Sequence, residues 1–273
     1  MISYKLQIQN GVKGLFRNND NARRHNNLEK GQGKMSYLTR IGRMSRSIFT
    51  LNRDREYNSL KRMLELRASD SLLDVGSGDG FWTARFAAHC AKVTGLEPDD
   101  GMLALAHTLY HRSNVEYVRG SAESIAYPDR TFDKVVSVSC LEHFSDPLKG
   151  LREMARVLKP GGRLAISVDS LLPENSPTSF REWHARRHFV THYFNREELL
   201  DMLKQVGLRS EPGRTEHLFR SRLAARVRQF FIRRTRLWLP LFPFLYGVVR
   251  LADRIADDMH GQIIIVTATR ELN

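Results

Sequence analysis

The sequence predicts an α/β fold in which helices cover both faces of one mostly parallel sheet. Three observations lead to this prediction. Short apolar runs alternate with helix-like segments from residue 71 onward, three closely spaced glycines follow the first run, and a β-branched run lies near the end of the chain. Alternating strands and helices favour parallel pairing with right-handed crossovers. The 273 residues are enough for one such domain with appendages.

The hydrophobic pattern places the individual elements. Six apolar runs are expected to form strands: 72–75, 92–96, 115–118, 134–138, 163–168 and 261–270. Five segments with helical spacing are expected to form helices: 52–67, 81–91, 101–111, 147–158 and 195–206. Asp99 or Asp100 can cap the third helix. Asn195, followed by Glu198 three residues later, resembles a capping box and predicts the start of the fifth helix.

Composition divides the chain into an extension and a domain. Residues 1–50 are basic, and residues 18–34 are rich in asparagine with few large apolar side chains. Such a segment can bury little surface, so we predict a partly disordered, basic N-terminal extension. Residues 51–273 are predicted to form the folded domain.

A basic and apolar helical insert is predicted at residues 214–251, before the last strand. Large apolar residues recur there at helical spacing, with arginines between them: Phe219, Leu223, Val227, Phe230 and Phe231. An uncharged apolar and aromatic run follows at 237–246. Arginines beside an apolar face suit an element that lies on an anionic membrane. The alternative is that the apolar face packs on the sheet or in a dimer while the arginines are solvated.

Charge is concentrated in two parts of the chain. The formal net charge is +13, and residues 1–69 hold 15 Lys and Arg against 5 Asp and Glu. Residues 214–239 hold 8 Arg against one Glu. This asymmetry indicates an anionic membrane or another anionic partner. Nucleic acid is less favoured, because the aromatic residues form one apolar block and do not alternate with basic residues.

Composition also limits the setting. Two cysteines, Cys90 and Cys140, cannot form a disulfide framework, so a cytoplasmic location is expected, with membrane association as an addition. No His or Cys cluster has metal-ligand spacing, and no metal is expected. The longest apolar run, 237–249, is too short for a membrane span and contains two prolines.

The stretch 71–83 predicts a nucleoside-binding turn. An apolar run containing Asp74 leads into Gly76, Gly78 and Gly80, and a helical pattern follows. Glycines permit positive φ and let the backbone approach a ligand closely. Glu97 ends the second predicted strand about 20 residues later, where an acid can accept hydrogen bonds from both hydroxyls of a ribose.

Four blocks extend this pattern: LLDVGSGDG, VTGLEP, GSAESIAYPDRTFDKVVSVSCLEHFSDP and LREMARVLKPGGRLAIS. With them, residues 70–169 resemble the class I S-adenosylmethionine-dependent methyltransferases, of the quinone-biosynthesis and small-molecule group. The resemblance implies a Rossmann-like sheet of seven strands. It also implies an enzyme whose cofactor is S-adenosylmethionine.

The resemblance assigns cofactor-binding residues by position: Asp74, Gly76, Ser77, Gly78, Gly80, Glu97, Pro98, Ser121, Ala122 and Cys140. Asp74 and the glycines match the part of the motif that contacts the methionine portion, and Glu97 matches the acid that binds the ribose. Ser121 stands where relatives usually carry an acid beside the adenine. Cys140 falls where relatives line the sulfonium, and no Pro-Cys pair favours a nucleophilic role for it.

Methyl transfer needs the acceptor and the methyl group held in line, and sometimes a base. His143, after the fourth strand, is the first candidate base, and His192 and Tyr193 are candidates in the segment that would cover the site. The predicted acceptor is a small or lipid-like molecule, methylated at oxygen or carbon. Two alternatives stay open: an RNA or protein methyltransferase, and a scaffold without catalysis.

Overall fold

The computed structural model describes residues 51–211, 213–233, 239–256 and 260–272. They belong to one compact unit. The predicted extension at 1–50 lies outside the described residues and stays a prediction, as does the part of the insert at 234–238.

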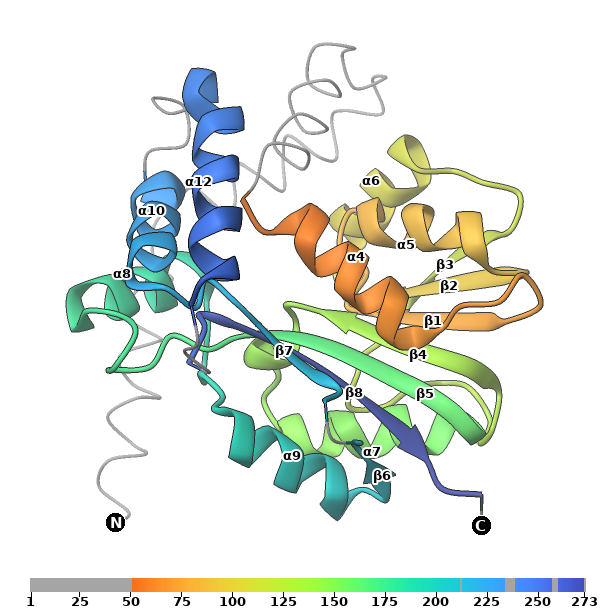
Figure 1. Ribbon diagram of the computed structural model, residues 1–273. Helices are drawn as coiled ribbons and strands as arrows, with labels where there is room; N and C mark the ends of the chain where they lie inside the picture. Colours follow the sequence, from red (N-terminus) through yellow and green to blue (C-terminus); the bar gives the residue numbers. More distant parts are fainter. Residues whose placement is uncertain (1–50, 212, 234–238, 257–259, 273) are drawn as a thin grey trace, which may run out of the picture. The chain divides into compact units, whose positions relative to one another are not determined.

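One sheet of eight strands forms the centre of the described residues. The strands are β1 (Ser71–Val75), β2 (Lys92–Glu97), β3 (Val115–Arg119), β4 (Phe132–Val138), β5 (Leu158–Asp169), β6 (Leu208–Arg209), β7 (Thr215–Leu218) and β8 (Ile263–Arg270). Their order is β3-β2-β1-β4-β5-β8-β6, with β7 also paired to β8. The first five are parallel, and β8 is antiparallel to its neighbours (Figure 1). The predicted α/β fold with a mostly parallel sheet is confirmed.

The sheet departs from the expected seven strands at one edge. β6 pairs with the end of β8 at Arg270, whereas β7 pairs with its beginning at Ile263. The two short strands therefore share the edge position beside β8, and the chain leaves the sheet between them. The seventh position exists, but it is divided.

Helices cover both faces of the sheet. They are α4 (Arg53–Leu64), α5 (Phe81–Phe86), α6 (Asp100–Leu109), α7 (Pro147–Val157), α8 (Thr178–His188), α9 (Arg196–Gln205), α10 (Arg222–Arg233) and α12 (Phe242–Arg254). Short 3-10 turns lie at η1 (Ala87–His89), η2 (Leu141–His143) and η3 (Leu239–Leu241). One apolar core packs α7 and α9 against the sheet, and a second packs α4, α5, α10 and α12 on the other face (Figure 1).

Side-chain caps begin two helices where the sequence predicts them. Asp99 Oδ1 accepts a hydrogen bond from the Met102 N–H over 2.8 Å, at the start of α6. Asn195 Oδ1 accepts from the Glu198 N–H over 2.8 Å, at the start of α9. Each cap satisfies a backbone donor that the first turn of a helix leaves unpaired.

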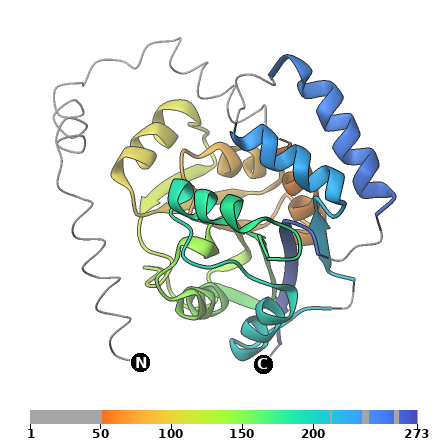
Figure 2. The same cartoon turned by 90° about the vertical axis from the view of Figure 1, so that its left-hand side faces the viewer.

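The insert before β8 differs from the prediction in two ways. It opens with the strand β7, and α10 buries only part of the predicted apolar set, since Phe231 is buried and Val227 packs on the core while two other members are exposed. The buried residues of α10 are Ala224, Ala225, Arg228 and Phe231. Leu223 and Phe230, predicted for the apolar face, are exposed. Arg228 is also buried on this helix, and its Nη2 pairs with Asp169 Oδ1 over 2.6 Å. α10 and α12 then lie side by side (Figure 2).

Candidate functional site

The glycine loop after β1 bends tightly across the end of β2. Gly76 and Gly78 have φ values of 77° and 55°, a region that favours glycine. The Gly76 N–H donates to the Leu96 carbonyl over 2.8 Å. A Cβ on Gly76 would lie 2.0 Å from Cys140 Sγ, whereas a Cβ on Gly78 would meet nothing within 4 Å. The loop is closely packed at Gly76 and presents bare backbone at Gly78.

This packing predicts a large cost for Gly76→Ala. We expect the free energy of unfolding to fall by roughly 2–4 kcal/mol, from backbone strain and the clash with Cys140 together. Gly207→Ala is the matched control, because Gly207 has φ 75° and open space around its Cβ position. Urea denaturation of both variants measures the difference. Equal losses would contradict the steric argument, and Cys140→Gly in the Gly76→Ala background should restore part of the loss.

Glu97 lies at the carboxyl end of β2, facing this loop. Its side chain is largely buried, and Oε2 accepts from the Gly78 N–H over 3.0 Å. Oε1 accepts from the Asp99 N–H over 3.1 Å. Two backbone donors therefore hold the carboxylate beside the glycine loop. A carboxylate can still accept further hydrogen bonds, since it has about four acceptor sites.

A cavity of about 390 Å³ opens beside Glu97, where the strand order reverses between β1 and β4. In open α/β sheets, ligands bind at this switch point. The residues lining the cavity come from the ends of the strands and the loops after them: Gly76, Leu96, Glu97, Pro98, Gly120, Ser121, Ala122, Glu123, Ser139, Cys140, His143, Phe144 and Ser145. The structure thus brings together six of the ten predicted cofactor-binding residues and one predicted catalytic residue.

The other four predicted residues lie behind or within the loop. Gly78 meets Glu97 through its N–H, and Gly80 precedes α5. Asp74 is buried and accepts from Thr83 Oγ1 over 2.6 Å, which ties β1 to α5. Burial raises the pKa of Asp74 to about 7. Ser77 turns its hydroxyl toward Gly95 of β2. Asp74 and Ser77 therefore support the shape of the loop.

Cys140 occupies the wall of the cavity next to Gly76. Burial raises the pKa of its thiol well above the usual range, and nearby Glu142 and Glu97 raise it further. The thiol stays protonated at neutral pH and is a poor nucleophile. Cys140 serves as a small wall residue, in keeping with the reading that disfavours covalent catalysis.

His143 is the predicted catalytic residue that reaches the cavity. It is exposed in η2 after β4, and its Nδ1 lies 3.2 Å from the Phe189 carbonyl. A carbonyl only accepts, so Nδ1 carries the proton in that contact. In the neutral ring, Nε2 is then left as an acceptor.

The structure does not bring His192 and Tyr193 to this cavity. His192 Nε2 lies 2.8 Å from Glu198 Oε1 on α9. The Tyr193 hydroxyl donates to the Arg181 carbonyl over 3.2 Å and lies 3.0 Å from His184 Nδ1. Both side chains thus join α9 or α8 to the segment between these helices.

A buried polar cluster at the carboxyl ends of β4 and β5 was missed by sequence reasoning. Arg228 NH2 pairs with Asp169 Oδ1, and the Asp169 N–H donates to Glu142 Oε1 over 3.3 Å. Burial raises the pKa of Glu142, and the neighbouring Asp169 raises it further. Burial lowers the pKa of His184, whose Nε2 is 3.6 Å from Asp169 Oδ2, to about 4.

Glu56 of α4 belongs to the same cluster. Its side chain is 1% exposed, and burial, helped by Asp169, raises its pKa to about 7. In the sequence, this cluster is marked only by Arg228, which stands among the apolar residues of α10. Its partner Asp169 lies 59 residues away in the chain, so spacing could not reveal the pair.

Among the described residues, no three His, Cys, Asp or Glu side chains are grouped so that they could hold a metal ion. No helix in the described ranges is both long and apolar enough to cross a bilayer.

Several known proteins with similar sequences are methyltransferases. The sequence model of a family described as "Methyltransferase domain" matches residues 73–166. The 27-O-demethylrifamycin SV methyltransferase of Amycolatopsis mediterranei is 37% identical over 119 residues, 42% of this chain and 44% of that protein. The ubiquinone/menaquinone biosynthesis C-methyltransferase UbiE of Escherichia coli is 36% identical over 108 residues, 37% of this chain and 43% of its own. The chain spans less than half the length of these relatives.

Solved structures extend the match to the fold. YcgJ of Bacillus subtilis aligns with a TM-score of 0.58 and 18% identity, over 80% of this chain and 99% of that chain. Phosphoethanolamine N-methyltransferase 2 of Haemonchus contortus, in complex with S-adenosyl-L-methionine, gives 0.59 and 21%, over 80% and 52%. The [4+2]-cyclase SpnF gives 0.57 and 25%, over 81% and 82%.

The sheet order, the glycine loop and Glu97 at the end of β2 are the features of a Rossmann-like nucleoside-binding domain. Residues 73–166 match the methyltransferase-domain family, in agreement with the resemblance to the class I S-adenosylmethionine-dependent methyltransferases. The cofactor of this class is S-adenosylmethionine.

Proposed function

We propose that this protein transfers a methyl group from S-adenosylmethionine to a small-molecule acceptor, at oxygen or carbon. The observation that carries the proposal is the cavity at the switch point, which is lined by Glu97, Gly76 of the glycine loop and His143. Its volume is within the range of small-molecule sites. Several curated relatives are named as methyltransferases of small molecules, among them rifamycin and quinone precursors.

The lining residues fit the proposed cofactor. Glu97 is fixed by two backbone donors and can accept from ribose hydroxyls. Open space at Gly78 leaves room for a ligand against the backbone. Ser121 and Ala122 form the wall assigned to the adenine, where a serine hydroxyl replaces the usual acid. When bound, the cofactor supplies a methyl group already activated on a sulfonium, so the protein mainly has to hold the acceptor in line.

His143 is the residue we propose to take a proton from a hydroxyl or an acidic carbon. Its Nδ1 is held by the Phe189 carbonyl, which leaves Nε2 to accept. We expect His143→Ala to lower kcat about 100-fold while S-adenosylmethionine affinity changes little. His111→Ala, at an exposed histidine after α6, is the control. An unchanged kcat in His143→Ala would mean that the acceptor needs no base from this residue.

We also propose that the acceptor is lipid-like and that this cytoplasmic protein meets it at a membrane. The support is chemical: apolar side chains and arginines lie together on the insert before β8. UbiE acts, by its name, in ubiquinone and menaquinone biosynthesis. A lipid-like acceptor would explain why a methyltransferase domain carries such an insert.

Calorimetry followed by product analysis tests the proposal. Titration with S-adenosylmethionine should give saturable binding to a single site. Incubation of cell extract with cofactor labelled in the methyl group should then yield a labelled small molecule. Label in RNA or protein would favour the alternative substrate classes. Binding without any labelled product would favour a scaffold or another chemistry, which the fold permits, since one neighbour of the same fold is a cyclase.

A further inference from the structure

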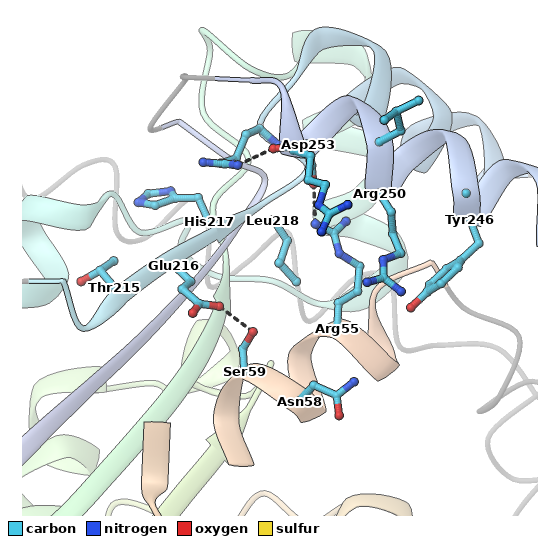
Figure 3. Close-up of a pocket in the computed structure, with 14 residues that line it drawn as sticks. Arg55, Asn58, Ser59, Thr215, Glu216, His217, Leu218, Tyr246, Arg250 and Asp253 are labelled. Atoms are coloured by element: carbon cyan, nitrogen blue, oxygen red, sulfur yellow. Dashed lines mark hydrogen bonds and ion pairs between the residues drawn. The ribbon is translucent and has the colours of Figure 1, made fainter. Parts of the chain in front are cut away.

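A second pocket lies on the face of the molecule formed by α4, β7 and α12. Its volume is about 650 Å³, and it shares no lining residue with the cavity beside Glu97. Arg55 comes from α4, Arg220 follows β7, and Arg250 and Arg254 come from α12. Figure 3 shows the side chains of Arg55 and Arg250 extending into the space between α4 and α12. We name it the arginine pocket.

The acids in the arginine pocket are already neutralised by partners. Asp253 Oδ2 pairs with Arg55 NH2 over 2.6 Å and accepts from the Phe219 N–H over 2.7 Å. Asp253 Oδ1 accepts from the Arg220 N–H over 2.8 Å. Glu216 accepts from Ser59 Oγ over 2.6 Å (Figure 3). Glu216 also pairs with Arg62 of α4.

Two arginines of the pocket keep their charge available. Among the described residues, neither Arg250 nor Arg254 has a carboxylate within salt-bridge distance, and Arg250 rests over the Tyr246 ring at 5.8 Å. The pocket is lined by four arginines and by two acids that already have partners, so its net charge is positive. The guanidinium groups of Arg250 and Arg254 remain available as hydrogen-bond donors. Guanidinium groups match phosphate geometry through paired hydrogen bonds. The chemistry of the pocket therefore suits a phosphate group.

An apolar stripe runs along α12 next to this pocket. It consists of residues spaced three, four, three and four apart: Leu241, Phe244, Val248, Leu251 and Ile255. Phe244, Leu251 and Ile255 are 68%, 63% and 77% exposed. With 3.6 residues per turn, this spacing keeps the stripe on one side of the helix, while Val249 and Ala252 face the core. Leu251 also lines the arginine pocket, so the two features adjoin.

We propose that the arginine pocket binds the phosphate of an anionic lipid headgroup while the apolar stripe of α12 enters the acyl region. Apolar side chains flanked by arginines are the composition of helices that lie in a membrane interface. A nucleic acid would contact the arginines but would leave the apolar stripe exposed to water. The charge and the stripe together therefore favour a lipid surface. This inference deepens the proposed encounter with a membrane, but its test can fail without any change in methyl transfer, because it uses other residues.

Vesicle flotation of the full chain tests it. Binding to phosphatidylcholine vesicles that contain phosphatidylglycerol should be strong at low salt and weaker at high salt. The double variant Arg250→Gln/Arg254→Gln should lower the partition coefficient roughly 30-fold, since each arginine near an anionic surface contributes about one kcal/mol. Phe244→Ser/Leu251→Ser should lower it at least about tenfold at both salt concentrations.

Matched controls are available elsewhere on the molecule. Arg152→Gln on α7 and Leu272→Ser, whose side chain is 83% exposed, should bind as the wild type does. Soluble glycerol phosphate should compete only weakly if the stripe contributes, and fully if a free phosphate compound is the true ligand, which would overturn the proposal. It would also be overturned by no flotation at low salt, or by equal loss in the controls. An RNA shift, or a dimer, that the same variants abolish while vesicles remain unbound would assign this face to another partner.

Discussion

Glu97→Ala is expected to weaken S-adenosylmethionine binding about 100-fold or more. The carboxylate is proposed to accept two hydrogen bonds from the ribose, and hydrogen bonds to a charged group are worth about 1.5–3 kcal/mol each. The same carboxylate holds the Gly78 and Asp99 N–H groups, so its removal also releases the glycine loop. Isothermal titration calorimetry measures the change in Kd.

Two further variants sharpen this test. Glu97→Gln keeps the size and loses the charge, so it should fall between the wild type and Glu97→Ala. Glu116→Ala, on the neighbouring strand β3 with a partly exposed side chain, should bind as the wild type does. Thermal unfolding without ligand shows how much the loop itself depends on Glu97. Unchanged affinity in a folded Glu97→Ala protein would remove the basis of the proposed cofactor site.

Glu56→Gln is expected to stabilise the protein at pH 8 and to have little effect at pH 5. In the unfolded chain Glu56 titrates near pH 4.5, whereas burial raises its pKa to about 7 in the folded protein. Between these values the folded state holds a proton that the unfolded state has lost. Stability therefore falls as pH rises from about 4.5 to 7, and the penalty stays constant above that range.

The amide removes this ionisation while it keeps the shape of the side chain. A shift of this size corresponds to about 3 kcal/mol, which is the expected gain in the free energy of unfolding at pH 8. Urea denaturation at the two pH values measures it. Asp74, His184 and His217 titrate in both proteins and cancel in the difference, whereas Glu142, whose pKa Glu56 raises, ionises more easily in Glu56→Gln and adds to the gain at pH 8. Equal gains at pH 5 and pH 8 would show that the effect comes from packing and not from ionisation.

Much of the fold could be predicted because its signals are local. The parallel strands β1, β2, β4 and β5 are mostly buried and contain apolar runs that are visible in the sequence, whereas the edge strand β3 is partly exposed. The caps at Asp99 and Asn195 act on the first turn of their own helix. The glycine loop and Glu97 lie about 20 residues apart within one strand-helix-strand unit. The part of the candidate site formed by the glycine loop and Glu97 could therefore be predicted from the sequence.

The remaining features depend on contacts between distant segments. β6 has two residues and β7 has four, too few for an alternating pattern to stand out. The buried face of α10 includes Arg228 paired with Asp169, and the periodicity of apolar residues alone cannot anticipate a buried arginine. His192 was predicted beside the acceptor, yet it pairs with Glu198 on α9. The arginine pocket joins α4, β7 and α12, which are far apart in the sequence, so no local pattern could predict it.

The raised pKa of the Cys140 thiol is expected to slow the reaction of this residue with oxidants. Peroxide and alkylating compounds react with the thiolate, and burial keeps this sulfur from ionising. A bulky adduct would also have to displace Gly76, whose backbone packs against the sulfur. Cys140 is therefore expected to oxidise slowly, which mass spectrometry of the thiol after peroxide treatment measures.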